Sequence, residues 1–259
     1  MLWILRCKTW VKTQTFVIIS MPIKLHRSTD RGYANHGWLD TRHSFSFASW
    51  YNPEHMGIGP LRVLNQDVIA GGSGFPSHGH KDMEIISIVL DGALEHRDSE
   101  GNQAVISPGE IQRMSAGNGV THSETNHYQD RPTEFLQIWI VPEKTGIEPS
   151  YQQMAIDTTN IASDQTLSVL ASPNGALGGV SIHQDATIYG GDIDAKTEIK
   201  HKIGGFRLGY FHLPKGGAVV NGMSLSEGDG LYLNGPEELD ITFTSDSYVL
   251  LFDLGNDVV

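Results

Sequence analysis

The chain has little of three things: cysteine, basic residues and long apolar runs. Its 259 residues include one cysteine, Cys7, which excludes an internal disulfide and leaves thiol catalysis with little support. Lys and Arg number 18 against 30 Asp and Glu, a net charge of −12. Because this charge repels a phosphate backbone, we expect no direct nucleic-acid binding. No apolar run approaches the roughly 20 residues that span a bilayer, so we expect no membrane span.

The first twenty residues, MLWILRCKTWVKTQTFVIIS, differ from the rest of the chain. Arg6, Lys8 and Lys12 divide their apolar residues into two pieces, whereas a secretory signal has one continuous apolar core of about 7–15 residues. From Met21 the sequence resembles the usual start of a cytosolic protein. We interpret residues 1–20 as an extension from a misplaced start codon, outside the fold, with a targeting segment as the alternative. We expect a cytoplasmic protein.

Short runs rich in β-branched and aromatic residues recur between turns of Gly, Pro, Asn and Asp, and no long segment shows a helical period. This pattern predicts an all-β chain of antiparallel sheets, as a sandwich or barrel, with few short helices. The predicted strands are 62–69, 85–90, 93–97, 104–107, 111–115, 120–125 and 135–141, then 167–170, 206–213, 218–220, 231–233, 239–244 and 248–254.

A short internal sequence repeat indicates two similar units in tandem. SPGEIQRMSAG (107–117) and SEGDGLYLNGP (226–236) share a Ser-x-Gly-acid turn, a short strand and a Gly turn, and an apolar strand follows each. We therefore predict two β-barrels, residues 21–145 and 146–259. The boundary falls in a polar stretch where EPSYQQM is predicted to form a short helix.

Two pairs of residues carry the chemistry. His78 and His80 stand two positions apart, and so do His122 and Glu124 in the predicted strand 120–125. Because residues i and i+2 point to one face of a strand, each pair can reach a single point. A lone His-x-His is more often a surface pair, but two pairs in one barrel favour a metal site. Three imidazoles and a carboxylate suit Fe(II), Mn(II), Ni(II), Cu(II) or Zn(II).

The surrounding sequence resembles a known family. The stretches DTRHSFSFASWYNPEHMGIGPLRVLNQDVI, HGHKDMEIISIVLDGALEHRDSEGN and GNGVTHSETN closely resemble the pirin family, and the likeness extends from about Met21 to the C-terminus. The spacing also resembles the two cupin motifs: Gly72, five residues, His78-x-His80, three residues, Glu84; then Gly119, two residues, His122, three residues, Asn126.

The resemblance implies a bicupin of two tandem antiparallel jelly-roll barrels, with one metal ion in the N-terminal barrel. Matched residue by residue, it gives the ligands as His78, His80, His122 and Glu124. Glu84 matches the acid of the general cupin motif and is interpreted as a supporting residue. Matching the second turn to the first places Ile241 and Phe243 where His122 and Glu124 stand, so we assign the C-terminal barrel no metal. His96, beside a turn, is interpreted as structural, with a position lining the site as the alternative.

Several pirins are similar to quercetinases, which open a flavonol ring with O2. The resemblance therefore implies a metal-dependent dioxygenase acting on a flavonol such as quercetin, with Glu124 accepting the hydroxyl proton. Fe(II) is the first candidate cofactor, and Ni, Cu, Mn, Co and Zn are the others. The alternative is an iron-binding redox sensor that regulates a protein partner without turnover. We expect a monomer whose partners are a small aromatic or enolic substrate and O2.

Overall fold

The structure is a computed structural model that describes residues 23–156, 167–235 and 237–256. Regular structure in these ranges consists of β-strands in four sheets, with one helical segment, the 3-10 turn η1 (Ser28–Asp30). The all-β prediction is confirmed. The predicted extension, residues 1–20, lies outside the described residues. None of the described helical structure is long and apolar enough to cross a membrane.

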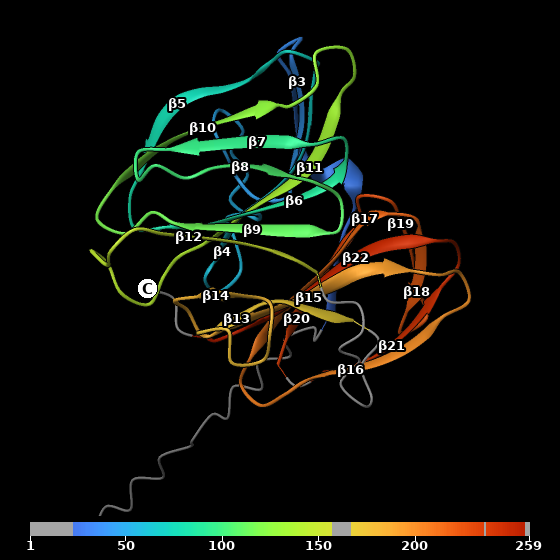
Figure 1. Ribbon diagram of the computed structural model, residues 1–259. Coiled ribbons are helices and arrows are strands. Elements are labelled where there is room, and N and C mark those ends of the chain that lie inside the picture. The colour runs from blue at the N-terminus through green and yellow to red at the C-terminus, as the bar shows by residue number, and fades with distance from the viewer. Residues whose placement is uncertain (1–22, 157–166, 236, 257–259) are drawn as a thin grey trace, which may run out of the picture.

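The first domain, in the upper part of Figure 1, is a sandwich of two antiparallel sheets. Its smaller sheet has the order β5 (Gly74–His80), β10 (Val120–Asn126), β7 (Leu94–Asp98), β8 (Gln103–Ile106). Its larger sheet has the order β12 (Ser150–Ala155), β9 (Glu110–Ser115), β6 (Glu84–Asp91), β11 (Thr133–Ile140), β4 (Leu61–Ile69), β3 (Leu39–His43), β2 (Gly32–Asn35). The prediction of a helix at EPSYQQM is wrong, because this segment forms the edge strand β12.

The second domain repeats this arrangement. Its smaller sheet has the order β16 (Glu198–Ile203), β21 (Glu237–Phe243), β18 (Gly217–Val220), β19 (Met223–Ser226). Its larger sheet has the order β1 (Ile23–His26), β20 (Gly230–Asn234), β17 (Leu208–Lys215), β22 (Ser247–Leu254), β15 (Ala186–Ile193), β13 (Ser168–Pro173), β14 (Val180–Ile182). The tandem jelly-roll prediction is confirmed, with one correction: the sheets pack as sandwiches and do not close into barrels.

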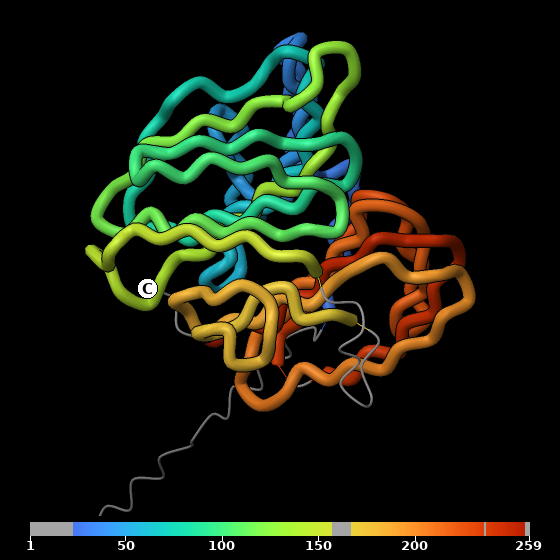
Figure 2. Tube along the Cα trace, in the orientation of Figure 1, coloured from blue at the N-terminus to red at the C-terminus, as the bar shows by residue number. Residues whose placement is uncertain are grey.

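Two strands lie across the predicted boundary between residues 145 and 146. β12 follows this boundary in sequence but pairs with β9 of the first domain. β1 precedes the first domain's strands but pairs with β20 of the second. Figure 2 shows β12 along the edge of the first sandwich that faces the second. The exact division stays a prediction, and these two strands tie the domains together.

The burial of each strand reflects its layer. Strands of the smaller sheets alternate buried and exposed residues, as in β21, because one face meets solvent. Central strands of the larger sheets, such as β6 and β22, are buried on both faces and read as continuous apolar runs. Their outer faces form one core shared by both domains, with Ile138 of β11 and Leu250 of β22 among its members. The domains therefore pack large sheet against large sheet.

The interiors of the two sandwiches differ. The second is filled by a single apolar cluster that includes Ile241 and Phe243. The first has two smaller clusters, and β11 connects them: Phe135 belongs to one and Trp139 packs against the other. Gln137 lies between these two on the same face of the strand. The interior of the first sandwich is therefore polar at its centre, and this centre holds the site described below.

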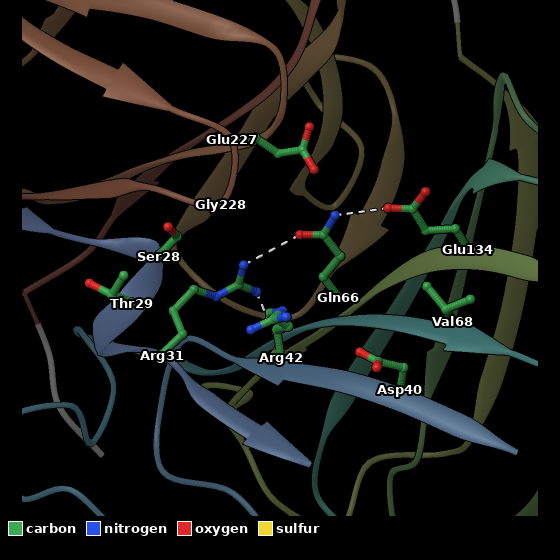
Figure 3. Close-up of a pocket in the computed structure, with 10 residues that line it drawn as sticks. All are labelled: Ser28, Thr29, Arg31, Asp40, Arg42, Gln66, Val68, Glu134, Glu227 and Gly228. Carbon is green, nitrogen blue, oxygen red and sulfur yellow. Dashed lines mark hydrogen bonds between the residues drawn. The ribbon is translucent and has the colours of Figure 1, made fainter. Parts of the chain in front are cut away.

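A cavity of about 420 Å³ opens where the domains meet (Figure 3). The Arg31 guanidinium lies at its centre and donates to Gln66 Oε1 at 3.3 Å and to the main-chain oxygen of Arg42 at 3.1 Å. The Gln66 amide donates in turn to Glu134 Oε1 at 2.8 Å. Burial lowers the pKa of Arg31 to about 10, so the guanidinium stays charged at neutral pH. This network joins β3, β4 and β11 beside the second domain.

Candidate metal centre

Two paired strands of the first domain carry three histidines on their inner face. His78 and His80 lie on β5, and strand alternation points them the same way, with Gly79 turned outward. His122 of β10 stands opposite His78 in the antiparallel register. Nitrogen atoms of the three rings lie within 4.8 Å of one another, and the closest pair of ring centroids is 4.5 Å apart.

The histidine rings offer unprotonated nitrogen atoms that could bind a cation. His78 Nδ1 donates to the main-chain oxygen of Pro76 at 2.8 Å, so its Nε2 carries the free lone pair. That atom lies 3.1 Å from His122 Nε2. Burial, and then the neighbouring histidines, lower the pKa of His80 to about 4 and of His122 to about 2, so both rings are neutral at pH 7. Because neutral imidazole lone pairs this close repel unless a proton or cation lies between them, the cluster fits a transition-metal ion.

Glu124 stands two residues after His122 and is 1% exposed. Ser87 Oγ donates to its Oε1 at 3.0 Å and Gln137 Nε2 donates to its Oε2 at 2.7 Å. Burial raises the pKa of this carboxyl, and the nearby His96 and the two donors offset part of the rise. A Glu124 oxygen lies within 4.8 Å of nitrogen atoms of His96 and His122. The structure thus places the predicted ligands His78, His80 and His122 in one group, and it places Glu124 in a second group with His96 that shares His122.

A cavity of about 570 Å³ opens beside this cluster. His78, His80 and Glu124 contribute to its wall. Much of the remaining wall is aromatic, from Trp38, Phe47, Trp50, Phe75 and Trp139. The Trp139 and His80 ring centroids are 4.9 Å apart, which places the indole next to the histidines. Flat apolar walls with a few polar groups suit a planar aromatic ligand.

Two family models match the chain. The model described as Pirin covers residues 25–140, and the model described as Quercetinase C-terminal cupin domain covers residues 169–254. An Escherichia coli (strain K12) protein named quercetin 2,3-dioxygenase is 43% identical over 232 residues, 90% of this chain and 98% of the relative. The chain belongs to the pirin family. The resemblance seen in the sequence is confirmed.

A solved pirin and a more distant solved structure share the fold, and a further relative is similar in sequence. The crystal structure of the bacterial pirin YhhW from Escherichia coli in complex with nickel(II) has a TM-score of 0.84 at 41% identity, covering 91% of this chain and 100% of that one. A pirin-like protein of Caulobacter vibrioides is 38% identical over 223 residues, 86% of this chain and 95% of the relative. A quercetin 2,3-dioxygenase from Acinetobacter baumannii, at 19% identity and a TM-score of 0.72, covers 90% of this chain and 86% of its own and shows the fold alone.

One residue beside the candidate ligands of this pirin was interpreted from the sequence as structural. His96 of β7 is fully buried, and the register of β7 with β10 sets it opposite Glu124. Its Nε2 lies 3.1 Å from Asp98 Oδ2, and its Nδ1 lies 3.4 Å from His122 Nδ1. Burial acts to raise the pKa of Asp98, but hydrogen bonds from Asn102 and His96 outweigh it and the pKa falls below its usual value. His96 therefore links a carboxylate to a predicted ligand, and the i, i+2 spacing of His96 and Asp98 was the available signal.

The second domain of this pirin has apolar residues at the matching positions. Ile241 and Phe243 of β21 are buried in its core, as the turn alignment placed them. Ile241 pairs with Ile199 of β16, the position that His78 holds in the first domain. The next position on that face is His201, which matches His80 and contacts the Tyr189 ring at 4.9 Å. Burial lowers the pKa of His201 and keeps it neutral.

Glu84 lies away from the histidine cluster. It sits on the face of β6 opposite Ser87 and is fully buried. Ser115 Oγ donates to its Oε2 at 2.8 Å, and His183 Nδ1 lies 3.2 Å from its Oε1. Because His183 belongs to the second domain, Glu84 supports the contact between domains.

Proposed function

We propose that this pirin is a metal-dependent dioxygenase that opens the ring of a flavonol such as quercetin. The observation that carries the proposal is the three-histidine cluster beside a cavity of about 570 Å³ with aromatic walls. The name of the 43% identical relative supports the same activity. Nothing in the described residues favours the redox-sensor alternative, which requires a partner-binding surface that changes with the metal.

One divalent transition-metal ion would be held by His78, His80, His122 and Glu124. Fe(II) is our first candidate, and the nickel(II) complex of a related pirin makes Ni(II) the first rival. When bound, such an ion supplies Lewis-acid chemistry and a place where O2 and an oxygen chelate can meet.

Residues of the chain would bind the flavonol, exclude water and take up its proton. The aromatic walls would stack on the flavonol rings and keep water from the reacting centre. Glu124 would accept the proton of the flavonol hydroxyl, since it borders the cavity and its burial favours the protonated form. Ser87 and Gln137 hold both carboxyl oxygens, so they would fix the direction from which Glu124 takes this proton.

The test uses metal-free protein reloaded separately with Fe(II), Ni(II) and Cu(II) and mixed with quercetin in air. We expect loss of the flavonol absorbance with uptake of O2 and release of carbon monoxide. His122→Ala should abolish the reaction and the bound metal together. His127→Ala, which removes an exposed histidine just beyond the same strand, is the matched control and should react normally. If the flavonol absorbance stays unchanged with all three metals, the proposal is wrong.

A further inference from the structure

A buried carboxyl in the same cavity has no role in the metal cluster. Asp67 of β4 is 2% exposed and borders the cavity. Its Oδ1 has no hydrogen-bond partner among the described residues. Other polar side chains of this wall are paired, since Asn65 contacts His43 at 2.9 Å and Gln137 donates to Glu124. A buried polar atom without a partner is uncommon in folded proteins and calls for a cause.

The opposite end of the cavity has a matching feature. Trp139 Nε1 is also buried without a partner in the part of the chain that the structure describes. Asp67 pairs with Phe135 of β11, so Trp139 lies four residues farther along that strand. At about 3.3 Å per residue the two positions are separated by about 13 Å. Trp139 adjoins the His80 ring, and four residues of β11 separate it from the level of Asp67, so a donor lies at the histidine end of this wall and an acceptor lies farther along it.

The surroundings of Asp67 favour a hydrogen bond from a ligand to its unpaired Oδ1. Burial raises the pKa of Asp67 to about 7, the hydroxyl of Thr41 offsets part of this rise, and the charge of Glu124 adds to it. The buried carboxyl thus has little contact with solvent and gains from any hydroxyl that reaches it. A long, flat ligand with a chelating oxygen pair at one end and a hydroxyl at the other would satisfy both unpaired atoms.

We propose that Asp67 is a specificity-determining residue that accepts a hydrogen bond from a ring hydroxyl at the end of the substrate remote from its metal-chelating edge. Trp139 Nε1 donates to a ligand oxygen near the histidines. This inference rests on the proposed function for its ligand class, flavonols. It adds a selection for flavonols that carry a hydroxyl on the remote ring over those that lack one.

The test measures binding of two flavonols to Ni(II)-loaded protein, kept free of O2, by quenching of tryptophan fluorescence. One flavonol carries hydroxyls on its pendant ring and the other has none there. Wild type should bind the first more tightly. Asp67→Leu should weaken binding of the hydroxylated flavonol about tenfold and leave the other within about twofold. Asp67→Asn, which keeps the shape and an acceptor oxygen, should recover part of the loss, and Asp91→Asn, an exposed acid on β6, should change neither.

Equal losses for both flavonols, no preference in the wild type, or no binding of either one would overturn the role of Asp67. The binding assay involves no turnover, so it separates the two proposals. If the metal-loaded protein leaves quercetin unchanged while the Asp67 preference persists, the dioxygenase proposal fails and the subsite stands. If turnover occurs and the ratio of KM values for the two flavonols is the same in Asp67→Leu, the subsite fails and the dioxygenase stands.

Discussion

Acid should destabilise this protein through a buried histidine that joins its two domains. His26 of β1 is 1% exposed, stacks on His55 at a centroid distance of 4.0 Å, and shares a 2.8 Å hydrogen bond with the Tyr210 hydroxyl. Burial, and then the charge of His55, lower its pKa from 6.5 to about 3. Because the folded pKa lies below the unfolded one, His26 contributes its full stability above about pH 6.5 and loses it as pH falls towards 3.

The size of the effect follows from those two pKa values. At about pH 4.5 protonation of this residue shifts the folding equilibrium toward the unfolded chain by a factor of about a hundred, which amounts to about 2.5 kcal/mol of lost stability relative to about pH 7.5. His26→Phe keeps a flat ring against His55 but cannot titrate. Urea unfolding at both pH values should therefore show a fall in unfolding free energy smaller by about 2.5 kcal/mol in His26→Phe than in wild type.

Histidines away from His26 titrate alike in both proteins, so their contributions cancel in this comparison. His55 does not cancel fully, because its charge acts on His26. His127→Phe, at an exposed histidine, should behave as wild type. A difference between wild type and His26→Phe of less than about 0.5 kcal/mol would show that His26 is not held neutral by its burial.

Three further changes test the core and the site. Ile138→Ala, fully buried in the core between the domains, should lower the unfolding free energy by about 2–5 kcal/mol in urea melts, and a loss near zero would contradict the shared core. Gln137→Leu removes the 2.7 Å donor to Glu124 and should weaken Ni(II) binding about 10–100-fold by calorimetry, whereas unchanged affinity would show that this carboxylate does not bind the ion. His96→Leu breaks the contact with His122 and should lower the affinity for Ni(II) about tenfold in folded protein. An unchanged affinity would show that the His122 ring is oriented without His96.

The elements that sequence analysis located correctly depend on local patterns. The strands predicted at 85–90, 120–125 and 248–254 correspond to β6, β10 and β22, because alternation and apolar runs are set by neighbours along the chain. The helix predicted at EPSYQQM failed for the opposite reason. Its residues have no strong preference of their own, and pairing with the edge of β9 decides their conformation.

Register explains the residues that sequence analysis missed. His96 stands 26 positions before His122 in sequence, and only the pairing of β7 with β10 brings their rings together. Asp67 was not predicted as a functional residue, because an acidic residue in a strand is usually exposed. The burial of Asp67 depends on both sheets closing over it. Glu84 matched a cupin motif, yet its side chain points to the domain interface because it lies on the other face of β6.

The sequence alone predicted the all-β class, the tandem repeat, the pirin family and a set of metal ligands. Each of these predictions depends on residue types at fixed spacings along the chain. Tertiary structure alone decided which strands pair, that two large sheets share one core, and that β1 and β12 cross between domains. It also decided which polar groups surround the cavity. Those features depend on contacts between distant segments, whose geometry arises only when sheets pack and exclude water.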